Sequence, residues 1–216
     1  GSKAWCKELL ERHRIPTPSC RVFSELNSAL SYLEGGAVFP LVIKASGLAA
    51  GKGVVICPDA STAAAAVRRM LETMEFGDAG GTILAEEFLS GPEASVFALT
   101  DGRTLVPLET CQDHKALLEG NKGPNTGGMG AYSPAPVMTE EMREKTMERI
   151  ILPTMRAMEQ DGRPFKGVLY AGLMITDRGP QLIEYNVRFG DPECQVLLAR
   201  WQSDPLAALI AAARGQ

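Results

Sequence analysis

Three side chains towards the end of the sequence are spaced so that they could bind a metal ion and a phosphate together. Glu184, Asn186 and Arg188 occupy alternate positions in LIEYNVRFGDPE, the stretch from Leu182 to Glu193. In a strand, alternate side chains point to one face and are about 6.6 Å apart. A carboxylate and an amide oxygen suit Mg²⁺, and an arginine suits a phosphate bridged by that metal. The alternative is a solvated strand face with an ordinary Glu–Arg pair, but the tight acidic turn from Phe189 to Glu193 is unusual at the end of a plain strand.

A second stretch, IKASGLAAGKGV, has the glycines and the lysine of a phosphate-binding loop. A Walker loop requires G-x-x-x-x-G-K followed by Ser or Thr, and it leads from a strand into a helix. Here only three residues separate Gly47 from Gly51, and Gly53 follows Lys52. The next residues are β-branched and a proline soon follows, which favours a strand. We therefore predict a loop that joins two strands as a hairpin, and not a Walker loop.

Two further features could meet an anion. Lys44 lies within the apolar run LVIKAS, where a buried ammonium group is unfavourable unless an anion meets it; an exposed strand face is the alternative. The segment GPNTGGMGAYSPAP, Gly123 to Pro136, offers exposed backbone amides and the side chains of Asn125 and Thr126. Closely spaced glycines allow such a backbone to approach a small ligand, whereas the alternative is a flexible surface loop.

Acidic residues suit other parts of a ligand. Glu86, Glu87 and Glu93 cannot bind a phosphate, but they could hydrogen-bond a ribose or the amino group of an adenine.

In Gln112 to Lys115, His114 is one of only two histidines, and no Ser-His-Asp order supports a nucleophilic triad.

The elements expected to position these residues are mostly hairpins, with helices between them. Helices are expected over 3–13, with Trp5, Leu9 and Leu10 on the apolar side and charge elsewhere, over 24–33 with Ser24 as cap, over 61–74, over 140–160 with a kink at Pro153, and after the cap Asp204. Strands are expected over 41–46, 53–57, 82–89, 94–100, 103–109, 167–176 and 180–188, and an irregular loop over 111–136. This order favours an α+β fold over a doubly wound sheet.

The composition narrows the class of protein. The 216 residues carry a formal charge of −4, whereas a general nucleic-acid binder would be basic. No apolar run approaches the ~20 residues of a membrane span, and the N-terminus lacks the apolar core of a signal peptide. Five widely spaced cysteines without a C-x-x-C pair favour a reducing, cytoplasmic setting. We therefore expect no nucleic-acid partner and no membrane partner.

Four segments carry a resemblance to a known family. KASGLAAGKGV, QDHK, GPNTGGMGAYSPAP and RFGDPECQ occur in this order, and together they resemble the phosphoribosylamine–glycine ligases, also called glycinamide ribonucleotide synthetases. The resemblance implies an ATP-grasp fold, in which two α+β subdomains with antiparallel sheets hold ATP between them. It places a smaller, lid-like subdomain around 17–87 and a larger one in 1–16 and 88–216, without the flanking N- and C-terminal domains of the family.

The resemblance also implies a reaction of purine synthesis. ATP, with Mg²⁺ or Mn²⁺, would phosphorylate glycine to glycyl phosphate, and the amine of 5-phosphoribosylamine would displace the phosphate to give glycinamide ribonucleotide. Lys3, Lys44 and a flexible lid containing Gly47, Gly51, Lys52 and Gly53 would contact the ATP phosphates, with Glu86, Glu87 and Leu89 at the adenine and Glu93 at the ribose. Glu184 and Asn186 would bind the metal, Arg188 and Lys44 would act in catalysis, and Asp113, Asn125, Thr126, Gly127 and Gly128 would hold glycine or phosphoribosylamine.

Two other functions remain open from the sequence. The chain could be an isolated ATP-binding fragment without full activity, or part of another ATP-grasp ligase that joins a different carboxylate and amine. The sequence also leaves open whether the parent chain is fused to other purine-synthesis enzymes.

Overall fold

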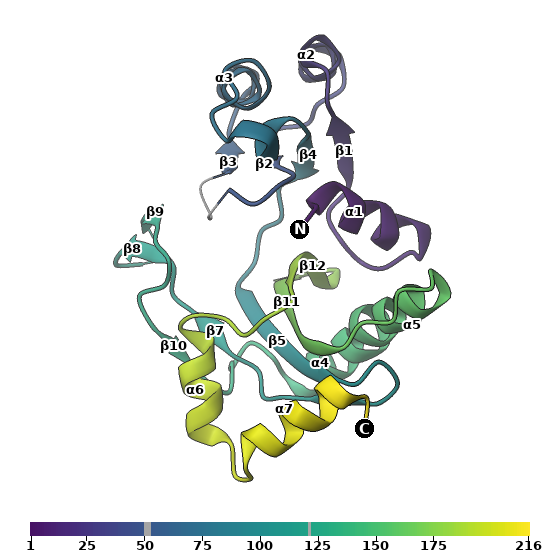
Figure 1. The fold of residues 1–216 in the computed structure, drawn as a ribbon. Helices are drawn as coiled ribbons and strands as arrows, with labels where there is room; N and C mark the ends of the chain where they lie inside the picture. The colour runs from purple at the N-terminus through teal and green to yellow at the C-terminus, as the bar shows by residue number, and fades with distance from the viewer. Residues whose placement is uncertain (50–52, 121) are drawn as a thin grey trace. The chain divides into compact units, whose positions relative to one another are not determined.

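The computed structural model describes residues 1–49, 53–120 and 122–216, which form two compact units (Figure 1). The first unit is Gly1–Leu89 and the second is Ser90–Gln216. The division expected from the sequence placed residues 1–16 with the larger subdomain. In the structure this segment is part of the first unit, where the backbone N–H of Lys3 donates to the carbonyl of Ser46 at 2.9 Å.

The first unit contains a four-stranded antiparallel sheet with the order β1-β4-β2-β3. Its elements are α1 (Lys3–Arg12), β1 (Cys20–Phe23), α2 (Leu26–Gly35), β2 (Leu41–Ala45), β3 (Val54–Cys57), α3 (Ala60–Leu71), the short 3₁₀ helix η1 (Gly77–Gly80) and β4 (Ile83–Glu87). The predicted hairpin is confirmed, because β2 pairs antiparallel with β3 and Lys44 lies opposite Val54. Strand β1 was not expected from the sequence.

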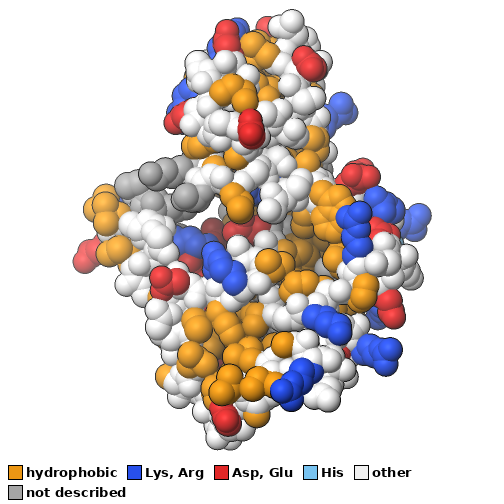
Figure 2. Space-filling view, in the orientation of Figure 1, with side chains coloured by type: hydrophobic (Ala, Val, Ile, Leu, Met, Phe, Trp, Pro, Cys, Tyr) orange, Lys and Arg blue, Asp and Glu red, His pale blue; other side chains and the backbone are white. Residues whose placement is uncertain are grey.

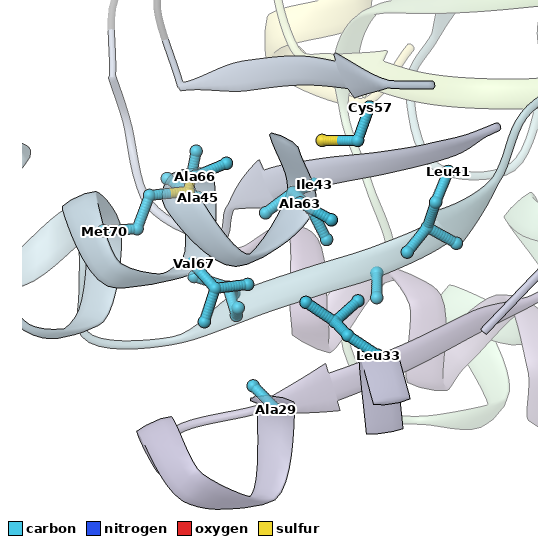
Figure 3. Close-up of a cluster of buried hydrophobic side chains, with 12 residues drawn as sticks. Ala29, Leu33, Leu41, Ile43, Ala45, Cys57, Ala63, Ala66, Val67 and Met70 are labelled. Carbon is cyan, nitrogen blue, oxygen red and sulfur yellow. The ribbon is translucent and has the colours of Figure 1, made fainter. Parts of the chain in front are cut away.

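Helices α2 and α3 cover one face of this sheet (Figure 1). Leu41, Ile43 and Ala45 of β2 belong to one cluster of buried apolar side chains, which also contains Leu33 of α2 and Val67 and Met70 of α3 (Figure 3). Because strand side chains alternate between faces, the residue between Ile43 and Ala45 must point to the opposite face. The apolar packing of the first unit therefore directs Lys44 away from this core.

The starts of the two covering helices differ from the prediction. Ser24 is not the cap of α2; the helix follows Glu25, whose side chain makes no capping hydrogen bond. Helix α3 follows Asp59, whose Oδ1 accepts a hydrogen bond from Thr62 N at 2.8 Å. Both serine and aspartate cap helices well, so composition alone did not identify the residue at which the chain turns.

The second unit contains another four-stranded antiparallel sheet, with the order β12-β11-β5-β6. These strands are β5 (Glu93–Thr100), β6 (Leu105–Pro107), β11 (Gly167–Thr176) and β12 (Gly179–Asn186). The helices are α4 (Glu140–Thr146), the π-helical turn η2 (Met147–Ile151), α5 (Leu152–Gln160), α6 (Glu193–Arg200) and α7 (Pro205–Arg214). Both predicted hairpins are confirmed, and with the first sheet they establish the α+β class.

Helices pack on the second sheet (Figure 1). Phe97 and Tyr170 lie in one apolar cluster with Leu197 of α6 and Ala212 of α7. On β12, the hydroxyl of Tyr185 hydrogen-bonds that of Thr154 on α5 at 2.7 Å. Hydrophobic side chains also remain on the outer surface over α6 and α7 (Figure 2), where Leu206 is 59% exposed and Ile210 is 40% exposed.

Three expectations for the second unit need correction or refinement. Residues 111–136 are not simply irregular, because they contain four short strands: β7 (Gln112–Asp113), β8 (Ala116–Leu118), β9 (Lys122–Asn125) and β10 (Ala131–Tyr132). Strand β7 pairs with β10, and β8 pairs with β9. Such short strands, broken by glycine and proline, leave little alternation to detect. Pro153, where a kink was expected, is the second residue of α5, and the π-helical turn Met147–Ile151 precedes that helix. Helix α6 was not expected.

Within the described residues, no helix combines the length and the apolar character that crossing a membrane would require.

Candidate functional site

A buried cluster of charged side chains lies on the sheet face of the first unit that is opposite its apolar core. Lys44 is 6% exposed, and its Nζ lies 2.6 Å from Oε2 of Glu86, which is 2% exposed. The other carboxylate oxygen, Oε1, lies 3.4 Å from Nζ of Lys7, which is 7% exposed. Of the two alternatives for Lys44, burial against an anion is therefore the one observed, and Glu86 is that anion.

Lys7 is a member of this cluster that was not predicted from the sequence. Helix α1 was expected to bury Trp5 and to expose its charged residues, yet Lys7 is buried and Trp5 is 37% exposed. Burial lowers the pKa of Lys7, with Glu86 acting in the opposite direction and Lys44 in the same direction. A lysine on a helix face with no local partner carries no signal for such a contact, because its partner comes from a distant strand.

The start of α1 lies beside the end of β2. Nζ of Lys3 donates to the carbonyls of Ala45 at 3.2 Å and Gly47 at 3.1 Å. Gly47 itself has no room for a side chain, since a Cβ there would lie 2.5 Å from Cα of Ala79. A Cβ on Gly53 would similarly lie 2.6 Å from Cβ of Ala49. The remaining candidate residues of this loop, Gly51 and Lys52, lie outside the described residues.

The end of β4 carries the other candidates of the first unit. Oε2 of Glu87 accepts a hydrogen bond from the backbone N–H of Ser19 at 3.1 Å, which links the end of β4 to the start of β1. Leu89 is buried and ends the unit. The structure therefore places Lys3, Lys44 and Glu86 around the end of β2, and Glu87 and Leu89 at the end of β4.

In the second unit, the register of the sheet places several candidates on one face. Gly172 of β11 lies opposite both Ser95 of β5 and Glu184 of β12, and the next pair on β12 is Asn186 with Tyr170. Residues opposite each other in adjacent strands point to the same face. The predicted pairing of Glu184 and Asn186 on one face is thus reproduced, with glycine between Ser95 and Glu184.

Arg188 is not part of that strand face. Strand β12 ends at Asn186, two residues before the end of the predicted strand. Arg188 is exposed, and its Nη1 donates to the carbonyl of Phe189 at 2.6 Å. Glu184 and Asn186 therefore share a strand face as predicted, whereas the prediction is wrong for Arg188, because the strand ends before the turn towards Pro192.

A lysine surrounded by carboxylates lies beside this face. Nζ of Lys115 is 3.2 Å from Oε2 of Glu93 and 3.4 Å from Oδ2 of Asp113. Burial lowers the pKa of Lys115, but Glu93, Asp113 and then Glu184 outweigh that effect, so the pKa is raised. Burial raises the pKa of Asp113, with Lys115 opposing it. Lys115 was not among the predicted site residues, although it belongs to the QDHK segment.

The glycine-rich segment contacts the turn before α6. Oγ1 of Thr126 donates to the carbonyl of Lys115 at 2.8 Å and accepts from N–H of Gly128 at 3.1 Å. Gly128 has φ +131°, and a Cβ there would lie 2.5 Å from Cδ of Pro192. A Cβ on Gly127 would meet nothing within 4 Å. The backbone of Asn125 pairs with Ala116 in the β8–β9 sheet.

Beneath the same turn lies a buried carboxylate that the sequence did not identify as a site residue. Oε1 of Glu193 accepts hydrogen bonds from the hydroxyls of Tyr170 at 2.6 Å and Ser95 at 3.2 Å. Glu193 is 2% exposed, and a Cβ on Gly190 would lie 2.1 Å from its Oε2. Glu193 therefore anchors the turn that follows Arg188 to the sheet.

The end of β12 offers oxygen ligands of the kind that a hard divalent cation prefers. Glu184 supplies an exposed carboxylate and Asn186 a half-buried amide, and both are oxygen ligands. Among the described residues there is no group of three or more His, Cys, Asp or Glu side chains able to hold a metal ion. The donor set suits a cation such as Mg²⁺, which retains water and phosphate ligands, better than a metal held in an all-protein cage.

Comparisons with known proteins identify the family and the fold of this chain. Residues 1–194 match the family described as phosphoribosylglycinamide synthetase, ATP-grasp (A) domain. A phosphoribosylamine–glycine ligase of Mesorhizobium japonicum is 56% identical over the whole chain, which covers 50% of that protein, and a chloroplastic one of Arabidopsis thaliana is 52% identical, of which the chain covers 41%.

A solved structure has the same fold. The crystal structure of phosphoribosylamine–glycine ligase from Thermotoga maritima matches all of this chain with a TM-score of 0.91 at 33% identity, and the chain covers 54% of it. The chain thus spans about half the length of the relatives that it matches. It belongs to the phosphoribosylglycinamide synthetase family and carries the ATP-grasp domain of that family.

Proposed function

We propose that the full-length protein containing this chain is an ATP-dependent ligase that joins glycine to 5-phosphoribosylamine. The products would be glycinamide ribonucleotide, ADP and phosphate, as a step of purine synthesis in the cytoplasm. The observation that carries the proposal is the 56% identity to a phosphoribosylamine–glycine ligase over the whole chain. Because that relative is twice as long, the activity belongs to the complete protein.

In the first unit, the proposed role is binding of the nucleotide. Lys44 and Lys3 contribute positive charge at the end of β2, where a phosphate-bearing ligand would be stabilised. The tight glycines 47 and 53 shape the described ends of the loop, and Gly51 and Lys52 are proposed to contact the phosphates as well. Glu86, Glu87 and Leu89 are proposed to line the adenine site.

In the second unit, the proposed role is binding of the metal and the acceptor substrates. Mg²⁺ or Mn²⁺, held by Glu184 and Asn186, would neutralise charge on the phosphates. Glu93 is proposed to bind the ribose, and Arg188 to stabilise the transferring phosphoryl group. The substrate residues are Asp113, Asn125, Thr126, Gly127 and Gly128; the Lys115 ion pair holds the carboxylate of Asp113 in place.

The proposed reaction does not use a nucleophilic triad of the protein. Their proposed contribution is to orient the glycine carboxylate towards the terminal phosphoryl group of ATP and to neutralise charge there. The resulting glycyl phosphate is a reactive acyl donor, which the amine of phosphoribosylamine attacks at the carbonyl carbon. The carbon–nitrogen bond forms as the carbon–oxygen bond to phosphate breaks, and the ammonium proton leaves to solvent.

Turnover of the full-length protein tests this proposal. ADP release with ATP and Mg²⁺ should require both glycine and phosphoribosylamine, and L-alanine or L-serine should replace glycine poorly. ADP release that does not depend on glycine would contradict the proposal, and a strong preference for another carboxylate would favour the other ligase class.

Calorimetry with Mg²⁺ and ATP distinguishes the remaining alternative. If residues 1–216 bind ATP but show no turnover while the full-length protein is active, the flanking regions complete the substrate site. ATP binding by a full-length protein that shows no turnover with any acid and amine would favour a binding module.

A further inference from the structure

Lys7 is a buried lysine to which neither the motifs nor the proposed reaction assigns a role. Its Nζ donates to Oγ1 of Thr17 at 2.6 Å and to the carbonyl of Pro18 at 3.2 Å, and it lies 3.4 Å from Oε1 of Glu86. An ammonium group has three N–H donors. All three are matched by acceptors of the protein, so Lys7 has no donor left for a ligand.

Lys44 differs from Lys7 in this respect. Within the described part of the chain, its only polar side-chain partner is Oε2 of Glu86, at 2.6 Å. Its ammonium group therefore keeps donors that Glu86 does not use, at a residue that is 6% exposed. A buried cation with unused donors is a site where an anion would be stabilised.

The balance of charge in the cluster depends on Lys7. Two lysines share one carboxylate, which gives a formal charge of +1 in a region where all three side chains are at least nine-tenths buried. Without Lys7, Glu86 would pair with Lys44 alone and the pair would be neutral. Interactions between buried charges are screened much less than those at the surface. The presence or absence of the charge on Lys7 should therefore change how strongly this cluster attracts an anion.

Lys7 also determines where α1 lies. Lys3 precedes it by four residues and therefore projects from the same side of the helix. The contacts of Lys7 with Thr17 and Glu86 fix the helix against β4, and Lys3 reaches the carbonyls of Ala45 and Gly47.

We propose that Lys7 is a positioning residue for phosphate recognition. It pairs with one oxygen of Glu86, so that Lys7, Glu86 and Lys44 together keep a net charge of +1, and Lys44 can present that charge to a polyphosphate ligand. Lys7 acts through Glu86 and does not touch the ligand. The inference rests on the proposed function in that the natural ligand would be a nucleoside triphosphate.

A double-mutant cycle in the full-length protein tests this role. The Kd of Mg²⁺–ATP and of tripolyphosphate is measured by calorimetry for wild type, Lys7→Met, Glu86→Gln and the double variant, with thermal melts of each. Lys7→Met should weaken both ligands about tenfold, corresponding to 1.4 kcal/mol. In the Glu86→Gln background the same change should weaken them less than about threefold, because without the carboxylate Lys44 keeps its uncompensated positive charge whether or not Lys7 is present.

The measured Kd values either support or overturn the proposed role of Lys7. An unchanged Kd in Lys7→Met, or an equal loss in both backgrounds, would overturn the proposal, because a merely structural lysine acts independently of the charge on Glu86. If Lys7→Met does not fold, the comparison of Glu86→Gln with the double variant remains, and a tenfold loss there would overturn it. Arg12→Met, at an exposed position of α1, serves as the matched control and should leave Kd unchanged.

The proposed ligase activity is tested separately from this role. A wild-type protein that binds tripolyphosphate and completes the cycle as expected, but forms no glycinamide product, would retain the role of Lys7 and reject the ligase. A wild-type protein that binds neither ligand would overturn the role of Lys7.

Discussion

Gly128 lies directly against Pro192, so that the two most distinctive segments of the sequence meet in space. A Cβ on Gly128 would lie 2.5 Å from Cδ of Pro192 and 3.2 Å from the carbonyl oxygen of Asp191. GPNTGGMGAYSPAP and RFGDPECQ are far apart in the chain, yet each fixes the position of the other. The loop proposed to hold the substrates is therefore held by the turn that follows Arg188.

Gly128→Ala should disturb this contact. The added methyl group meets Pro192 and the φ of +131° is unfavourable for alanine, so we expect a loss of roughly 1–3 kcal/mol in stability. In the full-length protein, KM for glycine or phosphoribosylamine should rise while the Kd of ATP changes little. Gly127→Ala is the control, since a Cβ there meets nothing within 4 Å. Equal effects of the two substitutions on KM would contradict the packing argument.

Lys44→Ala should affect both stability and nucleotide binding. The substitution removes one of the two partners of Glu86 and leaves it paired with Lys7, so a loss of roughly 1.5–3 kcal/mol is expected. Urea denaturation measures that loss, and calorimetry should show ATP binding at least about tenfold weaker. Lys145→Ala, in an exposed pair with Glu141 on α4, should leave ATP binding unchanged. Wild-type affinity in Lys44→Ala would remove this lysine from the proposed site.

Glu184→Gln should change the metal dependence of ATP binding. Loss of a direct ligand should weaken metal binding at least as much as loss of an outer partner does, about tenfold or more. The half-saturating Mg²⁺ concentration, followed through ATP binding in the full-length protein, should rise accordingly. Glu159→Gln on the exposed surface of α5 is the matched control. A metal requirement that is equal in both variants would contradict the assignment of Glu184.

Tyr170 should contribute to the pH dependence of stability. Burial, and then its hydrogen bond to Glu193, raise the pKa of Tyr170 above its ordinary value of 10. Its contribution is therefore complete below pH 10 and is lost as the pH rises above that value. Tyr170→Phe should lower the unfolding free energy by roughly 1–3 kcal/mol at neutral pH, since Glu193 loses a partner.

Urea denaturation between neutral and alkaline pH measures the Tyr170 effect. The decline of the unfolding free energy above pH 10 should be steeper in wild type than in Tyr170→Phe. The buried thiol of Cys111, whose pKa burial raises to about 11, contributes in both proteins and so does not alter the difference. Parallel curves would show that the tyrosine remains equally protonated in the folded and unfolded states.

The elements that the sequence predicted well have local signals. The hairpin from β5 to β6 turns at Asp101, whose Oδ1 accepts hydrogen bonds from the backbone N–H groups of Arg103 at 2.8 Å and Thr104 at 2.6 Å. The last helix begins after Asp204, whose Oδ1 accepts from Leu206 N at 2.9 Å, as predicted. In both places, the residues that determine the structure are neighbours in the chain.

The features that the sequence missed depend on distant partners. Lys7 is buried because Glu86 of β4 meets it, and Glu193 is buried because Ser95 and Tyr170 meet it. Strand β1 is recognisable as a strand only through its pairing with β4, which is distant in the sequence. No residue near Lys7 or Glu193 in the chain indicates those contacts, so periodicity placed Lys7 on the charged side of its helix.

The candidate site was predicted most accurately where alternation applied. Glu184 and Asn186 share a face as expected, because both lie within β12. Arg188 does not follow the same rule, because the strand ends before it.

In the proposed reaction a glycyl phosphate forms before the amide bond, and an oxygen label on glycine can detect this step. Full-length protein is supplied with ATP, Mg²⁺, phosphoribosylamine and glycine carrying ¹⁸O in both carboxylate oxygens. If the carboxylate attacks the terminal phosphoryl group, one labelled oxygen leaves with the phosphate, so that mass spectrometry detects singly labelled inorganic phosphate in amounts equal to ADP. Unlabelled phosphate formed together with glycinamide ribonucleotide would exclude glycyl phosphate as the intermediate.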